Sequence, residues 1–98
     1  MTVTWSPRAV ERVAEIAVWI AADNTRAAHE LVENIFTAAE RLQDFPESGR
    51  QVPEFGRPDL REIICRKYRI IYRIRGNRVA ILTVRHSLQL LDGNELTE

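Results

Sequence analysis

The chain has 98 residues, of which 45% are hydrophobic and 29% are charged, and its 14 basic and 14 acidic side chains give a formal net charge of zero. A chain of this length has room for one domain, and its composition is typical of a soluble globular protein rather than a disordered one. We therefore expect a single domain over residues 1–98, with no membrane-spanning segment.

The cysteine and histidine content argues against disulfide and metal sites. One cysteine, Cys65, cannot form an internal disulfide, and two histidines without a cysteine cluster do not make a zinc-site pattern. The segment Met1–Trp5 is short and uncharged, and Ser6-Pro7 follows at once, which is unlike a signal peptide. We expect a cytoplasmic protein with no metal and no organic cofactor.

Charge is distributed unevenly along the chain. Residues 1–60 carry six basic and ten acidic side chains, for −4, whereas residues 61–86 carry eight basic and one acidic, for +7. The remaining residues, 87–98, contribute −3. A positive field concentrated in one segment can steer an anionic partner, either nucleic acid or an acidic protein segment.

Two amphipathic helices are predicted after a short strand at Val3–Trp5. Ser6 suits the N-cap of the first helix and Pro7 its first position, while Asp23–Thr25 supplies a break and a second cap. Apolar residues recur at spacings of three and four on one face of each helix: Ala9, Val13, Ile16, Ala17 and Ile20, then Ala28, Leu31, Val32, Ile35, Ala38, Ala39 and Leu42. The two helices should form an antiparallel hairpin.

The second half of the chain is predicted to be loop and sheet. Residues 46–59 hold three prolines and two glycines, which indicates an irregular connection, long enough to be packed or functional. Leu60–Cys65 should form a strand whose register is left open by Arg66-Lys67. Residues 87–98 are expected to be either a loose C-terminal tail or a short docking segment.

Gly76-Asn77 lies between two patterned strands, Tyr68–Arg75 and Arg78–His86, and suits a two-residue hairpin turn. The turn pairs Arg75 with Arg78, Ile74 with Val79, and Tyr72 with Ile81. One face then carries Tyr68, Ile70, Tyr72, Ile74, Val79, Ile81 and Thr83, and we expect it to lie under the helices. The other carries Arg69, Ile71, Arg73, Arg75, Arg78, Ala80, Leu82, Val84 and His86, and we expect it to be a mixed apolar and basic surface.

Four sequence blocks, in this order, resemble the signature blocks of the RelE/ParE toxin family of type II toxin–antitoxin systems: Phe45–Arg50, Leu60–Ile63, Tyr68–Tyr72 and Ile81–His86. The resemblance covers essentially the whole chain, and Tyr-Arg-Ile-Ile-Tyr ahead of the Gly-Asn turn is its most specific part. It implies an α+β fold in the order β-α-α-β-β-β, with an antiparallel two-helix hairpin packed on a mainly antiparallel four-stranded sheet. It also implies a toxin that is silenced by a cognate antitoxin.

The family includes RelE-like toxins, which cut messenger RNA on the ribosome, and ParE-like toxins, which poison DNA gyrase. If the chain were a nuclease, the resemblance would make Arg61, Arg69 and His86 its catalytic residues. However, Ile63 stands where a second cation is expected, and His86 is followed by Ser87 rather than by a tyrosine. The blocks therefore look more like ParE, and a family member that only binds its antitoxin is a third alternative.

For a ParE-like toxin, the resemblance and the charge pattern indicate two sets of binding residues. The predicted partners are a ParD-like antitoxin, in a hetero-oligomer that contacts DNA only through the antitoxin, and DNA gyrase as the target. Candidate target-binding residues are Arg61, Arg69, Arg73, Arg85 and His86. Candidate antitoxin-binding residues are Trp19, Arg69, Arg73 and Arg75. The simpler interpretation is that the arginines are solubilising charge, that His86 makes a structural hydrogen bond and that Cys65 is a buried small side chain.

Overall fold

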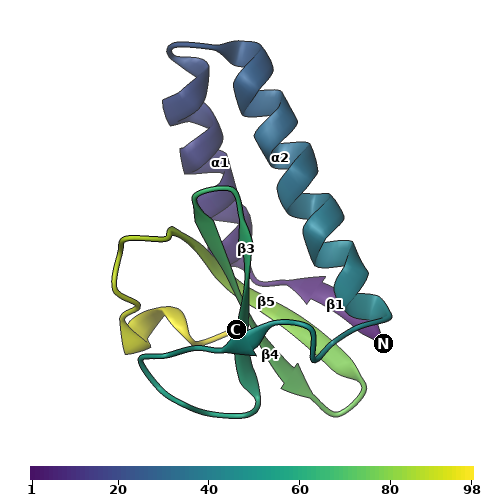
Figure 1. Cartoon of the computed structure of the whole chain (residues 1–98). Coiled ribbons are helices and arrows are strands. Elements are labelled where there is room, and N and C mark those ends of the chain that lie inside the picture. Colours follow the sequence, from purple (N-terminus) through teal and green to yellow (C-terminus); the bar gives the residue numbers. More distant parts are fainter.

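The computed structural model describes all 98 residues as a two-helix hairpin on one face of a twisted sheet, with the C-terminal segment on the other face (Figure 1). The elements, in chain order, are β1 (Thr2–Trp5), α1 (Pro7–Ala21), α2 (Thr25–Glu40), the 3-10 turn η1 (Arg41–Gln43), β2 (Arg50–Gln51), β3 (Leu60–Cys65), β4 (Tyr68–Arg75), β5 (Arg78–His86) and the 3-10 turn η2 (Gly93–Glu95). The predicted α+β fold is confirmed.

The sheet has five strands in the order β1-β5-β4-β3-β2, so the predicted count of four was wrong. β1 pairs with β5 in parallel, and every other pairing is antiparallel. The additional strand, β2, consists of Arg50 and Gln51, which pair with Glu62 and Arg61. Two residues are too few to show an alternating pattern, and this strand exists only because the loop returns along the edge of β3.

Both helix starts follow the predicted capping chemistry. The Ser6 hydroxyl accepts a hydrogen bond from the Ala9 amide at 3.0 Å, and the Asn24 side chain accepts one from the Ala27 amide at 3.0 Å. The Ser6 hydroxyl also donates to the Leu82 carbonyl at 2.8 Å. One side chain therefore caps α1 and joins its start to the middle of β5.

The predicted β4–β5 pairs are confirmed, but the predicted faces are wrong for Thr83, Val84 and His86. Arg75 pairs with Arg78, and Tyr72 pairs with Ile81, but Ile71 then pairs with Thr83. Leu82 is therefore the extra residue of a β-bulge, which reverses the alternation for the rest of β5. As a result, Val84 and His86 lie on the helix side, and Thr83 lies on the opposite side.

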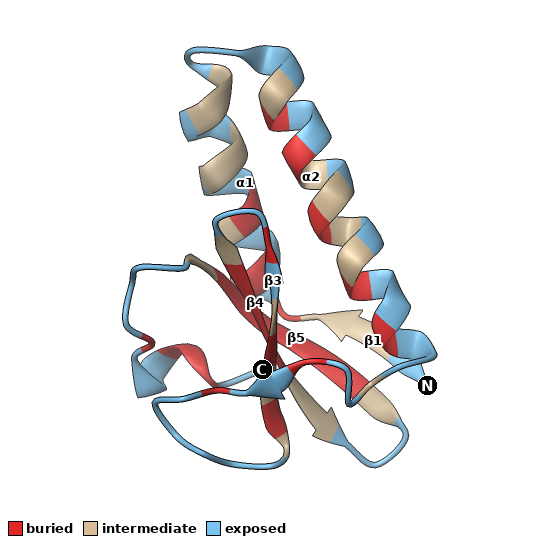
Figure 2. Ribbon diagram, in the orientation of Figure 1, coloured by how far each residue is buried: buried red, intermediate tan, exposed pale blue.

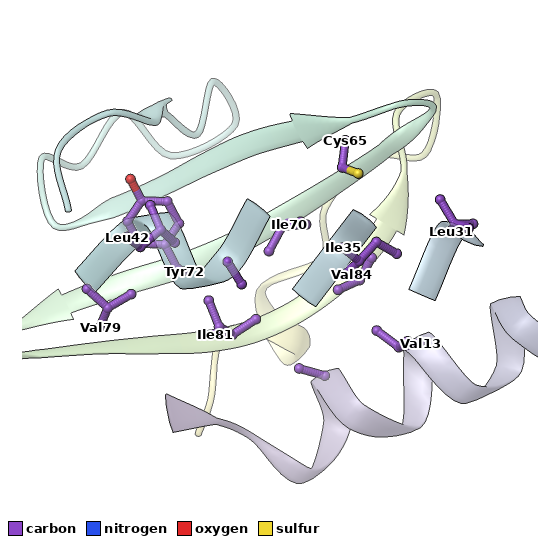
Figure 3. Packing of buried hydrophobic residues seen from close by; sticks show 12 residues of the cluster. Val13, Leu31, Ile35, Leu42, Cys65, Ile70, Tyr72, Val79, Ile81 and Val84 are labelled. Atoms are coloured by element: carbon purple, nitrogen blue, oxygen red, sulfur yellow. The ribbon is translucent and has the colours of Figure 1, made fainter. Parts of the chain in front are cut away.

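The helix side of the sheet holds the larger apolar core (Figure 3). Its buried residues come from both helices and from the three long strands: Ala9, Val13, Leu31, Ile35, Ala39, Leu42, Cys65, Ile70, Tyr72, Val79, Ile81 and Val84. Cys65 is a buried small side chain here, and burial raises the pKa of its thiol. The apolar stripes of the helices predicted this layer.

The opposite face is not the open surface that we expected. A second apolar cluster lies there, made of Val52, Leu60, Ile71, Ala80, Leu82, Leu91 and Leu96. Residues 46–59 and 87–98 supply its cover, and Figure 2 shows buried positions within both segments. Residues 87–98 are thus packed on the sheet, which excludes the loose tail, one of the two alternatives. No helix is long and apolar enough to cross a membrane.

Candidate partner-binding site

The sheet separates two arginines that the sequence placed in one site. Arg61 pairs with Tyr72 and therefore lies on the helix side, whereas Arg69 pairs with Ile64 and lies on the opposite side. The Arg61 guanidinium donates to the carbonyls of Gly49 at 2.9 Å and Pro58 at 3.0 Å. Arg61 therefore joins two backbone positions near the ends of residues 46–59, and its guanidinium is used in hydrogen bonds to carbonyls.

Arg69 lies in a closed network of charged groups and not on an exposed surface. Its side chain is only 5% exposed, and the guanidinium contacts two carboxylates. Nε donates to Glu62 at 2.7 Å, while Nη1 and Nη2 donate to the two oxygens of Glu54 at 2.8 and 2.7 Å. A further bond runs from Nη1 to the Gln89 carbonyl at 2.9 Å, and Nη2 lies 2.6 Å from Glu62. Four hydrogen bonds and this additional ion contact enclose the guanidinium within the protein.

The network extends from both carboxylates. The fully buried Glu62 side chain also pairs with Arg50. Arg50 Nε donates to Glu62 Oε2 at 2.7 Å, and Arg50 Nη2 lies 2.6 Å from the same oxygen. Glu54 accepts from the Leu91 amide at 2.8 Å. Hydrogen bonds from Arg69 and then from this amide lower the pKa of Glu54 to about 2, although burial opposes the shift. The bonds to Glu54 and Glu62 raise the pKa of Arg69.

The remaining arginines of the predicted basic face have different environments. Arg73 is 14% exposed, and its buried Nε has no hydrogen-bond partner and lies 3.8 Å from Asp59. Arg75, at the start of the hairpin turn, is exposed and makes no ion pair. Of the three arginines predicted to bind antitoxin, only Arg75 is freely accessible.

A groove between α1 and the end of β5 brings the other predicted residues together. It has a volume of about 430 Å³, and its lining includes Trp19, Tyr68, Arg85 and His86. Trp19 is 80% exposed. The rings of Tyr68 and His86 meet edge to face, with centroids 5.7 Å apart, and His86 Nδ1 accepts a hydrogen bond from the Leu88 amide at 3.1 Å. Trp19, predicted to bind antitoxin, therefore lies beside Arg85 and His86, predicted to bind the target.

Glu95 organises the cations of this groove, and the sequence did not single it out. Its carboxylate accepts from Thr83 at 2.9 Å and Arg12 Nε at 3.0 Å, and lies 3.3 Å from Arg85 Nε. The hydrogen bond to Glu95 is the main cause that raises the pKa of Arg12. Glu95 is buried within residues 87–98, which the sequence left open between a loose tail and a docking segment. The one available signal was Leu91 and Leu96 on either side of it.

The same geometry gives no convergent nuclease centre. Arg61 and Arg69 lie on opposite faces, and the Arg69 side chain is enclosed by its carboxylate partners. Cleavage of RNA by attack of a 2′-hydroxyl needs a base and cations around one phosphate. The structure does not bring Arg61, Arg69 and His86 together at one site. No group of three or more histidine, cysteine, aspartate or glutamate side chains is placed to hold a metal ion.

Comparison with known proteins identifies the family of this chain. The family described as ParE toxin of type II toxin-antitoxin system, parDE, matches residues 3–91. A protein of Sinorhizobium fredii named "Putative toxin Y4kP" is 39% identical over 90 residues, which cover 89% of this chain and 88% of that protein. A solved structure titled "Chromosomal ParDE TA system from P. aeruginosa" has the same fold, with a TM-score of 0.73 at 19% identity over 88% of this chain and 95% of that one. The chain belongs to the ParE toxin family of type II toxin–antitoxin systems.

Proposed function

We propose that this toxin poisons DNA gyrase in the bacterial cytoplasm and is silenced by a ParD-like antitoxin that occupies the Trp19 groove. The observation that carries the proposal is the groove itself: an exposed tryptophan beside arginines that Glu95 holds in place. Family membership supplies the toxin–antitoxin context. The hetero-oligomer would contact DNA only through the antitoxin.

The chemistry of the groove fits an amphipathic, acidic protein segment. Trp19 offers a large apolar surface that is 80% exposed to water, and buried tryptophans are frequent anchors of protein interfaces. Arg12 and Arg85 line the groove with positive charge, and Glu15, which also lines it, is paired with Arg12. An antitoxin helix with an apolar face and acidic neighbours would match both properties.

Gyrase is favoured over messenger RNA because a gyrase poison needs a binding surface and no chemistry of its own. The candidate nuclease residues Arg61 and Arg69 lie on opposite faces of the sheet, whereas Arg85 and His86 are both partly exposed in the groove. We expect Arg85 and His86 to contribute to contacts with the target.

A purified-component gyrase assay tests this function. With supercoiled plasmid and ATP, the free protein should accumulate cleaved DNA, and added antitoxin should reverse the effect. If gyrase is unaffected while messenger RNA is cut on translating ribosomes, the target assignment is wrong. Growth without inhibition on expression of the free toxin would indicate a member that only binds its antitoxin.

The groove assignment needs its own test. Trp19→Ala should weaken antitoxin binding by about 2 kcal/mol or more, as for the loss of an interface anchor, while gyrase poisoning persists. Val10→Ala, on the same helix and 51% exposed but outside the groove, is the matched control. Equal antitoxin affinity of the two variants would refute the groove as the antitoxin site.

A further inference from the structure

Arg69 and Glu54 connect the middle of the sheet to the segment Ser87–Leu91. Glu54 accepts from the Leu91 amide at 2.8 Å, and Arg69 donates to the Gln89 carbonyl at 2.9 Å. These bonds tie the backbone of an irregular segment to a buried ion pair. Such a pair is expensive to desolvate, so it is a poor way to gain stability alone.

Residues 87–89 form a turn and a bend after β5, and residues 87–90 are all exposed before the chain becomes buried at Leu91. Leu91 is buried in the second apolar cluster, and the Gln89 carbonyl points to Arg69. Leu88 is 87% exposed and Leu90 is 83% exposed, and these are the highest values among the large apolar residues of the protein. The network therefore holds two leucine side chains in water in a defined position.

We propose that Arg69 and Glu54 are positioning residues that present Leu88 and Leu90 to an apolar pocket on the protein target of the toxin. This inference rests on the proposed function for the identity of that target. Leucine side chains make no favourable polar contact with phosphates, so the partner of this pair is a protein and not a nucleic acid.

The location of the two leucines favours the target over the antitoxin. Together with Arg50, Pro53 and Glu54 they border a hollow on the loop side of the sheet. The Trp19 groove, which we assign to the antitoxin, has no residue in common with that hollow except Gln89. The hollow adjoins the groove at Gln89, so the leucine pair lies next to Arg85 and His86, which we also expect to contact the target. An antitoxin in the Trp19 groove would cover Arg85 and His86.

Two kinds of variant separate contact from positioning. Leu88→Ser/Leu90→Ser removes the apolar contacts, and Glu54→Ala releases the segment while leaving both leucines in the chain. Each should reduce the affinity for purified gyrase by about tenfold or more, the loss expected of an interface anchor. Arg57→Gln, which breaks an exposed ion pair to Asp59 in the same loop, should leave the affinity unchanged.

Amide hydrogen exchange measures positioning without reference to gyrase. In Glu54→Ala the Leu91 amide should exchange at least about tenfold faster, since its acceptor is gone, while the amides of Ile70 and Val84 in the β4–β5 ladder stay protected. In Leu88→Ser/Leu90→Ser all three should be unchanged. Unaltered protection of Leu91 in Glu54→Ala would overturn the positioning role.

Binding measurements with gyrase and with antitoxin show which protein contacts Leu88 and Leu90. Wild-type affinity for gyrase in Leu88→Ser/Leu90→Ser would overturn the contact, and a loss confined to antitoxin binding would show that the occupant is the antitoxin. If the unmodified toxin has no effect on gyrase, the proposed function fails, but the exchange experiment still tests the positioning role of Glu54.

Discussion

The two faces of the sheet are packed by different means. The helix side is a layer of apolar side chains from α1, α2 and the strands, and the alternating pattern of the sequence predicts most of it. The loop side combines the second apolar cluster with the buried charges of Glu62, Arg69 and Glu95. An apolar layer tolerates replacement of one side chain by another of similar size, because the neighbours can repack around it. A buried charge is stable only while each of its partners is in place.

The largest effect is expected from Glu62→Ala on the loop side. The substitution leaves Arg69 buried without one of its two carboxylates, and breaking a buried ion pair in this way costs about 3–5 kcal/mol. On the helix side, Ile35→Val should cost only about 0.5–1.5 kcal/mol. Urea unfolding of both variants measures the comparison, and equal losses would show that the two faces do not differ as argued.

A smaller effect is expected where the faces meet at the Tyr72 hydroxyl. It donates to the Pro46 carbonyl at 2.7 Å and accepts from the Gly49 amide at 3.0 Å. Tyr72→Phe should destabilise the protein by about 1–3 kcal/mol, because the part-buried Pro46 carbonyl and the buried Gly49 amide lose their partner. Thermal unfolding followed by circular dichroism would show it. A melting temperature equal to the wild-type value would mean that water replaces the hydroxyl.

Acid should loosen the loop side before the helix side. The pKa of Glu54 is lowered from 4.5 to about 2, so its stabilising contribution is fully present above pH 4.5 and is lost as pH falls through 2. Hydrogen exchange at the Leu91 amide should accelerate over this range relative to the helix-side amides, after correction for the intrinsic rate. Glu54→Gln, which does not titrate, should remove the pH dependence; a persistent one would point to another group.

The smallest effect is expected from the exposed ion pair of Arg57 and Asp59, at 2.6 Å with both side chains more than a third exposed. Water and salt screen such pairs, so Arg57→Gln should change the free energy of unfolding by no more than about 1 kcal/mol. A larger loss in urea unfolding would mean that the loop is held less by the buried network than its contacts indicate.

The sites could be predicted less well than the fold. Residue types and the family blocks correctly predicted an α+β toxin domain. The fold then places Trp19 at the surface, beside Arg85 and His86. The sequence could not show that Leu82 forms a bulge, which moved His86 to the helix side. It also could not show that Arg69 is enclosed, because its carboxylate partners lie 7 and 15 residues away in the chain.

The sequence by itself determined the helix hairpin, its caps, the Gly76-Asn77 turn and the family. These depend on neighbours within a few residues, where spacing, capping and turn chemistry act directly. Only the tertiary structure decided which arginines are accessible and where residues 87–98 pack. A charge is exposed or enclosed according to which distant carboxylate and which segment fold over it, and no local pattern encodes that choice.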